Sequence, residues 1–220
     1  MKVEIFDRQK LTNDFHRLFY EGDGGTKTWS ATKWFGTQML KSPLDMFLYA
    51  DLVYEVKPAL IVEIGTWSGG SALFFAHMLD HLSHGRVISV DLQKMRPDYP
   101  RHPRIDYVSG FSSLDTTTLN YVAEAAEPAD GPVMVILDSD HKKDHVLAEL
   151  KAYADFVTPG SYLILEDTNI NGHPVLDEHG PGPFEALAEW LPTREDYRDE
   201  TARLNKYLFT MHAWLRRRRV

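Results

Sequence analysis

Cysteine is absent from the 220 residues, which excludes disulfide bonds and thiolate metal sites. No apolar run approaches the roughly 18 residues that a membrane-spanning helix needs, and residues 1–8 lack the apolar core of a signal peptide. There is also no internal repeat and no low-complexity block. We therefore expect a cytoplasmic protein without stable membrane insertion.

The sequence also has no excess of basic residues. The net charge is −8, from 24 basic and 32 acidic residues, and this argues against nucleic acid as a partner. The run Arg216-Arg-Arg-Arg219 is a local exception. We interpret it as a solvated tail, with contact to an anionic partner as the alternative. The chain length fits one large domain better than two.

Apolar runs that are typical of buried strands alternate with segments of helical spacing. Strands are expected at 60–63, 86–91, 104–109, 133–138 and 161–166, with a last, sheet-completing strand at 207–214 that runs antiparallel. Helices are expected at 8–20, 43–56, 71–81, 115–126, 141–156 and 183–191. The near-continuous apolar strands fit a mostly parallel sheet that is buried on both faces. The alternation predicts a doubly wound α/β fold with helices on both faces.

A glycine-rich turn, Glu63-Ile-Gly65-Thr-Trp-Ser-Gly69-Gly70-Ser71, follows the first expected strand. A strand, a glycine turn and a helix open the nucleotide site of a doubly wound fold, because glycine lets a ligand approach the backbone closely. The spacing differs from the G-x-G-x-x-G of dinucleotide folds. The acid two residues before Gly65 repels a pyrophosphate and suits a ligand with an ammonium group. S-adenosylmethionine fits this pattern; a dinucleotide, or a turn used only for packing, is the alternative.

Acidic residues gather at the carboxyl ends of the other expected strands. Asp91 ends the second strand, where a carboxylate can accept hydrogen bonds from both hydroxyls of a ribose. Asp138-Ser-Asp140-His141 follows the fourth strand, and Glu166-Asp167 follows the fifth. Neighbouring strands lie about 5 Å apart, so three or four carboxylates would crowd one edge of the sheet. Like charges that close need a cation, and hard oxygen ligands favour Mg²⁺ or Mn²⁺ over Ca²⁺.

The motif Glu63-Ile-Gly-Thr-Trp-Ser-Gly-Gly-Ser-Ala72 resembles the first motif of class I S-adenosylmethionine-dependent methyltransferases. Its Gly-Gly-Ser ending is similar to the cephalosporin hydroxylase type, which includes rhamnosyl O-methyltransferases and is related to metal-dependent macrolide sugar O-methyltransferases. The resemblance continues through Lys57-Pro58, Asp138-Ser-Asp-His141 and Leu165-Glu-Asp-Thr168, over roughly residues 28–214. It implies a Rossmann-like methyltransferase sheet in a domain over 42–220, a Mg²⁺-dependent O-methyltransferase activity on a sugar, glycan or glycolipid hydroxyl, and a homodimer.

The same resemblance assigns roles to individual residues. Asp138, Glu166 and Asp167 look like the metal ligands, and His141 looks like the general base that takes the hydroxyl proton. The expected contacts of S-adenosylmethionine are Glu63, Gly65, Thr66, Gly69, Ser71, Asp91, Ser112 and Asp138.

Residues 1–41 are expected to form a short helical extension or lid in front of this domain. Trp29, Lys33, Trp34 and Phe35 lie close together in it. Aromatic faces stack on sugar rings and lids exclude water, so Trp29, Lys33 and Trp34 are candidate substrate contacts. The alternative places the aromatic side chains in the core. The long loop 167–182 offers one more candidate substrate contact, Asn169.

Other interpretations stay open at this point. Asp140 or Ser139 can cap a helix that begins at His141, and His145 fits a packing or surface position. None of the ten histidines has an acid two residues further on, which argues against a non-haem iron oxygenase. A methyltransferase of small phenols or antibiotic-type natural products and a non-catalytic cofactor-binding partner protein remain alternative functions.

Overall fold

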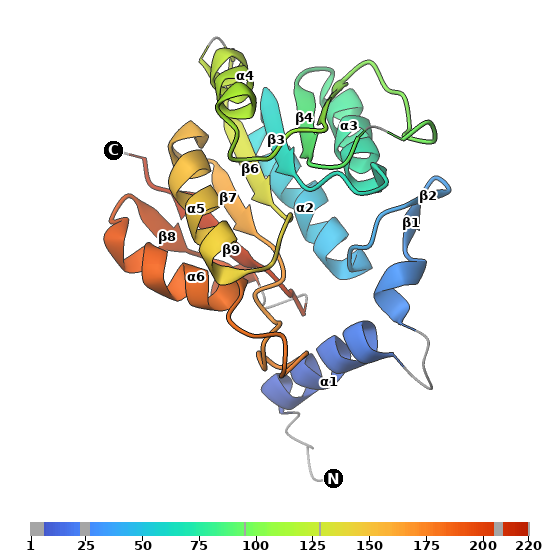
Figure 1. Ribbon diagram of the computed structural model, residues 1–220, viewed down its shortest axis with the longest axis vertical. Helices are drawn as coiled ribbons and strands as arrows, with labels where there is room; N and C mark the ends of the chain where they lie inside the picture. Colours follow the sequence, from blue (N-terminus) through green and yellow to red (C-terminus); the bar gives the residue numbers. More distant parts are fainter. Residues whose placement is uncertain (1–6, 23–26, 95, 128, 205–208, 220) are drawn as a thin grey trace, which may run out of the picture.

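The strands of the computed structural model, which describes residues 7–22, 27–94, 96–127, 129–204 and 209–219, form one large mixed sheet (Figure 1). Within the described residues this sheet has seven strands in the order β5-β4-β3-β6-β7-β9-β8. The first five are parallel; β9 pairs antiparallel with β7, and β8 pairs antiparallel with β9. The strands are β3 (Leu60–Ile64), β4 (Arg86–Asp91), β5 (Ile105–Ser109), β6 (Val133–Leu137), β7 (Tyr162–Leu165), β8 (Tyr197–Asp199) and β9 (Ala213–Arg217).

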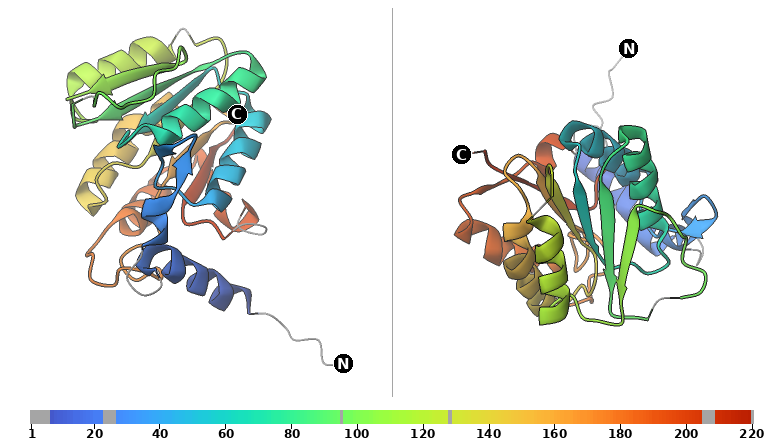
Figure 2. Two further views of the ribbon diagram at one scale, coloured as in Figure 1. Left: turned by 90° about the vertical axis from the view of Figure 1, so that its right-hand side faces the viewer. Right: turned by 90° about the horizontal axis from the view of Figure 1, so that it is seen from above.

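Helices cover both faces of the sheet, as the two views of Figure 2 show. One core lies between the sheet and α4, α5 and α6, and the other between the sheet and α2 and α3. This confirms the predicted doubly wound α/β fold. No helix in the described part of the chain is long and apolar enough to cross a bilayer. The helices are α1 (Arg8–Glu21), α2 (Pro43–Val56), α3 (Gly70–Leu82), α4 (Thr116–Ala126), α5 (Lys143–Tyr153), α6 (Pro183–Trp190) and α7 (Thr201–Leu204), with 3₁₀ turns at Thr28–Ala31, Ala154–Phe156 and Leu191–Thr193.

The bounds of α2 follow from local chemistry. Ser42 is its N-cap and accepts a hydrogen bond from the backbone of Leu44, and Pro43 occupies the first turn, where its missing N–H costs nothing. The helix ends at Lys57, which adopts a left-handed conformation immediately before Pro58. These are the bounds that the sequence predicts.

The strand order places a ligand crevice. The chain runs outward from β3 through β4 to β5, then returns to add β6 and β7 on the other side of β3. In open parallel sheets the crevice lies at such a switch point, outside the carboxyl ends of the strands. The ends of β3 and β6, with their loops, therefore frame the site.

The structure shifts two expected elements by two residues or more and adds short strands that were not predicted. The last strand was expected at 207–214, but β9 begins at Ala213 and runs to Arg217; residues 207–208 lie outside the described part. Arg216 and Arg217 therefore belong to the sheet: Arg216 pairs with Glu55, and Arg217 donates to the carbonyl of Val157. The expectation of a solvated tail is wrong for these two. The remaining differences are α5, which begins two residues later than expected, and the unpredicted strands β8, β1 (Lys33–Trp34) and β2 (Thr37–Gln38).

The N-terminal segment lies outside the two helical layers. Helix α1 lies beside the loop that follows β7 (Figure 1). The ring of Phe15 contacts that of Phe209, and His16 Nε2 lies 3.0 Å from the carbonyl oxygen of Phe209. The β1–β2 hairpin packs Trp34 edge-on against Phe74 of α3. The segment thus lies next to the carboxyl ends of the parallel strands.

Candidate active site

The glycine turn after β3 makes a close backbone approach to the end of β6. Gly65 has a φ of +106°, and a Cβ there would lie 1.8 Å from the carbonyl oxygen of Asp138. Gly69, with a φ of +78°, is the N-cap of α3. Glycine is required at Gly65 for both reasons, positive φ and lack of space. The two halves of the predicted site therefore meet at this point.

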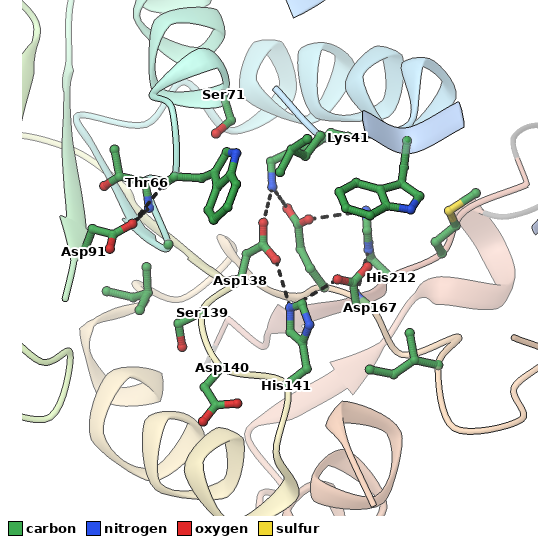
Figure 3. Close-up of a pocket in the computed structure, with 18 of the residues that line it drawn as sticks. Lys41, Thr66, Ser71, Asp91, Asp138, Ser139, Asp140, His141, Asp167 and His212 are labelled. Carbon is green, nitrogen blue, oxygen red and sulfur yellow. Dashed lines mark hydrogen bonds and ion pairs between the residues drawn. The ribbon is translucent and has the colours of Figure 1, made fainter. Parts of the chain in front are cut away.

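Asp91, at the end of β4, holds the turn in place. Its Oδ2 accepts hydrogen bonds from the backbone of Thr66 (3.1 Å) and Trp67 (2.8 Å), and its Oδ1 accepts one from Gln93 (2.8 Å). These bonds fix a carboxylate at the carboxyl edge of the sheet, next to the glycine turn (Figure 3).

Glu63 lies beneath the turn and has no exposed surface. Its Oε2 accepts a hydrogen bond from the hydroxyl of Ser89 at 2.6 Å. Burial raises the pKa of Glu63 to about 7, although Lys41, Ser71 and Ser89 act in the opposite direction.

Asp138, His141 and Asp167 come together at the ends of β6 and β7 (Figure 3). His141 Nε2 lies 3.3 Å from Asp138 Oδ1 and 3.1 Å from Asp167 Oδ2. One atom from each residue lies within 4.8 Å of the others, and among the described residues this is the group that could hold a metal ion. Burial opposes a charge on His141, but Asp167 and Asp138 outweigh it and raise its pKa to about 9.

The second carboxylate oxygen of Asp138 contacts a buried lysine. Lys41 Nζ lies 2.7 Å from Asp138 Oδ2 and 2.6 Å from Glu166 Oε1, and the Tyr49 hydroxyl donates to the same Glu166 oxygen at 2.6 Å. Burial would raise the pKa of Asp138, yet Lys41 and His141 hold it well below its usual range. Burial and the charge of Asp138 raise the pKa of Glu166, with Lys41 opposing them.

His212 contacts the cluster and the buried Asp45. The backbone N–H of Asp167 donates to His212 Nδ1 at 3.1 Å, so the proton of a neutral His212 belongs on Nε2. That nitrogen lies 3.4 Å from Asp45 Oδ2 and 3.6 Å from Glu166 Oε2. Both side chains are buried. Glu166 is thus contacted on both of its oxygens by protein groups.

The cluster and the glycine turn open into one cavity of about 710 Å³. Asp91 and Gly65 line it on the side of β3 and β4, and Asp138, His141 and Asp167 line it on the side of β6 and β7. A turn that suits a nucleotide-like ligand and an acid–histidine cluster therefore share one space.

Comparison with known proteins identifies the family. The family model described as Rhamnosyl O-methyltransferase/CmcI matches residues 26–218. The chain belongs to the rhamnosyl O-methyltransferase/CmcI family. The rhamnosyl O-methyltransferase of Mycobacterium leprae (strain TN) is 37% identical over 205 residues, which cover 91% of this chain and 86% of that protein.

Solved structures agree with this assignment. An apo structure of CmcI is 25% identical with a TM-score of 0.68, covering 90% of this chain and 81% of that one. A structure of CmcI with Mg and SAM has a TM-score of 0.64 at 24% identity, covering 89% of this chain and 80% of that one. The suspected family and the predicted class, an S-adenosylmethionine-dependent O-methyltransferase, are confirmed.

Within this family site, the structure brings most of the predicted residues to the cavity. The ones that line it are Trp29, Gly65, Thr66, Ser71, Asp91, Ser112, Asp138, His141, Glu166 and Asp167. Glu63 lies beneath the turn and Gly69 within it, and neither residue lines the cavity. The individual roles of all these residues stay predictions.

The predicted substrate contacts are divided by the structure. Trp29 faces the cavity. Trp34 instead packs on Phe74 and donates to His77 Nδ1 at 3.0 Å, and Lys33 is exposed on the hairpin. Asn169 is buried, and its side-chain amide has no hydrogen-bond partner among the described residues.

Two expectations at the end of β6 are corrected by the start of α5. The N-cap of this helix is Lys142, and no side chain caps it, so Ser139 and Asp140 are not its caps. Asp140 instead accepts a hydrogen bond from the backbone of Lys142 in the preceding turn. Ser139 donates to the buried Glu149, which also lies 3.0 Å from His145 Nε2.

Sequence reasoning missed Lys41, Asp45, Tyr49 and His212, which surround Glu166. Lys41 precedes the N-cap of α2, and Asp45 and Tyr49 share one face of that helix. Charged residues at four-residue spacing with an apolar helix face, such as Lys41 and Asp45, were the available sign, because buried charges need partners.

Proposed function

We propose that this chain transfers the methyl group of S-adenosylmethionine to a sugar hydroxyl, with a divalent metal at the carboxylate cluster. The observation that carries the proposal is the shared cavity: the glycine turn and Asp91 line one side, and Asp138, His141 and Asp167 line the other. A methyl donor and a metal-held hydroxyl need such neighbouring sites, because the reacting atoms must be brought into contact in a defined orientation.

S-adenosylmethionine and Mg²⁺ are the cofactors of this proposal. Support comes from the family, since the structure of CmcI described above contains both. Support comes also from the residues: Asp138 and Asp167 offer carboxylate oxygens on either side of His141. Glu166 lies beside Asp138 across Lys41. Oxygen-rich sites of this kind suit Mg²⁺ and Mn²⁺. A bound divalent cation supplies two effects, a lower pKa for a coordinated hydroxyl and a fixed orientation of it.

His141 is the group that we propose to take the proton. Against the effect of burial, Asp167 and Asp138 raise its pKa to about 9, and a divalent cation held by these carboxylates would offset that effect and leave a neutral imidazole that can accept a proton. The acceptor oxygen forms a bond to the methyl carbon, the carbon–sulfur bond breaks to release a neutral thioether, and the hydroxyl proton moves to the imidazole. Asp138 and Asp167 lie against Nε2 and stabilise the imidazolium that results. His141 is also partly exposed to the cavity, where an acceptor can reach it.

A rhamnose hydroxyl is the acceptor that the names of the relatives support most directly. Trp29 on the cavity wall offers an aromatic face of the kind that packs against a sugar ring. The test is to incubate the purified chain with S-adenosylmethionine, Mg²⁺ and either rhamnosides or small phenols, and to detect the methylated product by mass spectrometry. Methylation of rhamnosides is expected. Methylation of phenols alone would contradict the sugar assignment.

The roles of metal and base are tested in the same assay. We expect EDTA to abolish turnover and Mg²⁺ to restore it, and His141→Ala to reduce turnover by about 10²-fold or more while S-adenosylmethionine binding survives in calorimetry. His81→Ala, at the exposed end of α3, is the matched control and is expected to behave like the wild type. Full activity of the His141 variant would refute the assignment of the base.

Three further predictions accompany this function: a homodimer, a cytoplasmic location, and a division into an N-terminal segment (1–41) and a methyltransferase domain (42–220). Light scattering of the purified chain tests the first, and a mass equal to that of a single chain would contradict it.

A further inference from the structure

The ammonium group of Lys41 is buried between two carboxylates at the floor of the cavity. The side chain is 2% exposed, and Nζ contacts Asp138 Oδ2 and Glu166 Oε1 at 2.7 and 2.6 Å (Figure 3). A charged group so far from water persists only with charged or hydrogen-bonding partners. Lys41 therefore belongs to the cluster itself, although it comes from the residue before the N-cap of α2.

Asp138 divides the cluster into two positions for a cation. Its Oδ2 faces the ammonium of Lys41, while its Oδ1 faces His141 and, across it, Asp167 Oδ2. His141 and Asp167, the other two members of the group that could hold a metal, lie on the Oδ1 side. Glu166 lies on the other side, where its Oε1 is used by Lys41 and Tyr49. One position is thus filled by a side chain of the protein, and the other is the one offered to a metal.

The charges of the cluster support this division. Asp138, Glu166 and Asp167 contribute three negative charges when ionised, and Lys41 contributes one positive charge. With His141 uncharged, as its proposed role as a base requires, a single divalent cation makes the cluster neutral. A second divalent cation would leave an excess of positive charge in a buried place, which is unfavourable.

We propose that Lys41 is a tethered cation that fills the second cation position of the cluster and so limits the site to one divalent metal. The inference rests on the proposed metal-dependent function. In sites with two metal ions about 3.5–4 Å apart, both ions clamp the reacting groups; here the ammonium takes the place of one of them. Lys41 acts as a positioning residue, because it holds Asp138 and Glu166.

The test counts bound metal. The full chain, its Lys41→Ala variant and a Lys143→Ala control are titrated with Mn²⁺, and bound ion is measured by electron paramagnetic resonance and calorimetry. Lys143 is a lysine of α5 that pairs with Glu189, away from the cluster, so the control loses the same charge elsewhere. We expect one equivalent of Mn²⁺ in the wild type and the control, and two in Lys41→Ala.

The outcomes separate the two proposals. One equivalent in Lys41→Ala, or two in the wild type, would overturn the role of Lys41 and leave the metal-dependent function standing. No Mn²⁺ in the wild type would instead refute the metal site on which both rest. Lys41→Arg keeps the charge and is expected to bind one equivalent.

A measurement on the wild type keeps the inference open to refutation if Lys41→Ala does not fold. Lysine ammonium groups that are buried exchange slowly and give distinct ¹H–¹⁵N signals. We expect one such signal, missing from Lys41→Arg, and we expect it to persist at saturating Mg²⁺. If Mg²⁺ abolishes the protection of this signal, the metal displaces the ammonium, and Lys41 does not occupy a separate position.

Discussion

Glu63 is a buried carboxyl group whose pKa differs between the folded and the unfolded state. Its carboxyl group has no exposed surface, and burial raises its pKa from 4.5 to about 7. The native state therefore keeps a proton that the unfolded chain, with a pKa near the ordinary value, has already lost. Its neighbour Ser89 donates a hydrogen bond to the carboxyl group and so opposes this shift.

The sign of the pH effect follows from this difference. Between pH 4.5 and about 7 the native state binds more protons than the unfolded state, so this residue makes the free energy of unfolding fall as pH rises, by about 3 kcal/mol in total. Glu63→Gln cannot titrate. Urea unfolding at about pH 5 and about pH 8 should show the wild type losing stability relative to Glu63→Gln by that amount. An equal difference at both pH values would contradict the raised pKa.

At the scale of elements, the turn between β3 and α3 depends on the approach of Gly65 to β6. In Gly65→Ala the new Cβ would overlap the carbonyl oxygen of Asp138 at 1.8 Å, and the φ of +106° would be strained as well. We expect a loss of about 3 kcal/mol or more in the free energy of unfolding, together with loss of S-adenosylmethionine binding.

Gly180→Ala is the matched control for this substitution. Gly180 also has a positive φ, +83°, but nothing lies within 4 Å of the position of a Cβ. Strain alone should cost about 1–2 kcal/mol there, and cofactor binding should survive. Urea unfolding and calorimetry measure both effects. Equal losses in the two variants would show that close packing of the turn on β6 is not what requires glycine.

Some strands of the sheet could be predicted from the sequence and others could not. Long apolar runs such as Val133–Leu137 identify the central strands, because both faces of the sheet are buried. The two-residue strands of the β1–β2 hairpin carry no alternation that a pattern could detect. Strand β9 was placed too early, because Arg216 and Arg217 are unlike strand interiors and are accommodated by Glu55, Asp196 and backbone carbonyls.

Some residues of the candidate site could likewise be predicted from the sequence and others could not. Acids at strand ends were predictable, because the carboxyl ends of parallel strands share one edge. Lys41 and Tyr49 were not, because their contacts with Glu166 join positions 125 and 117 residues apart. Tyr49 lies eight residues after Lys41, and any helix with one buried face shows such a separation.

In the whole molecule, helix α1 connects the N-terminal segment to the site and to the residues before β9. The hydroxyl of Tyr20, near the end of α1, donates to Asp167, and His16 lies next to the carbonyl oxygen of Phe209. A hydrogen bond to a charged group contributes about 1.5–3 kcal/mol. We therefore expect the hydrogen bond to Asp167, a residue of the predicted metal cluster, to help hold α1 in position.

Tyr20→Phe removes this hydrogen bond and keeps the ring. We expect amide exchange in α1 to become about tenfold faster, since about 1.4 kcal/mol of local stability corresponds to that factor, while exchange in α3 stays unchanged. Turnover should fall because Asp167 loses the group that orients it. Tyr54→Phe, an exposed tyrosine on α2, is the control and should change neither quantity. Hydrogen exchange followed by mass spectrometry resolves the two helices. Unchanged exchange in α1 would mean that apolar contacts hold this helix in place and that the hydrogen bond to Asp167 does not.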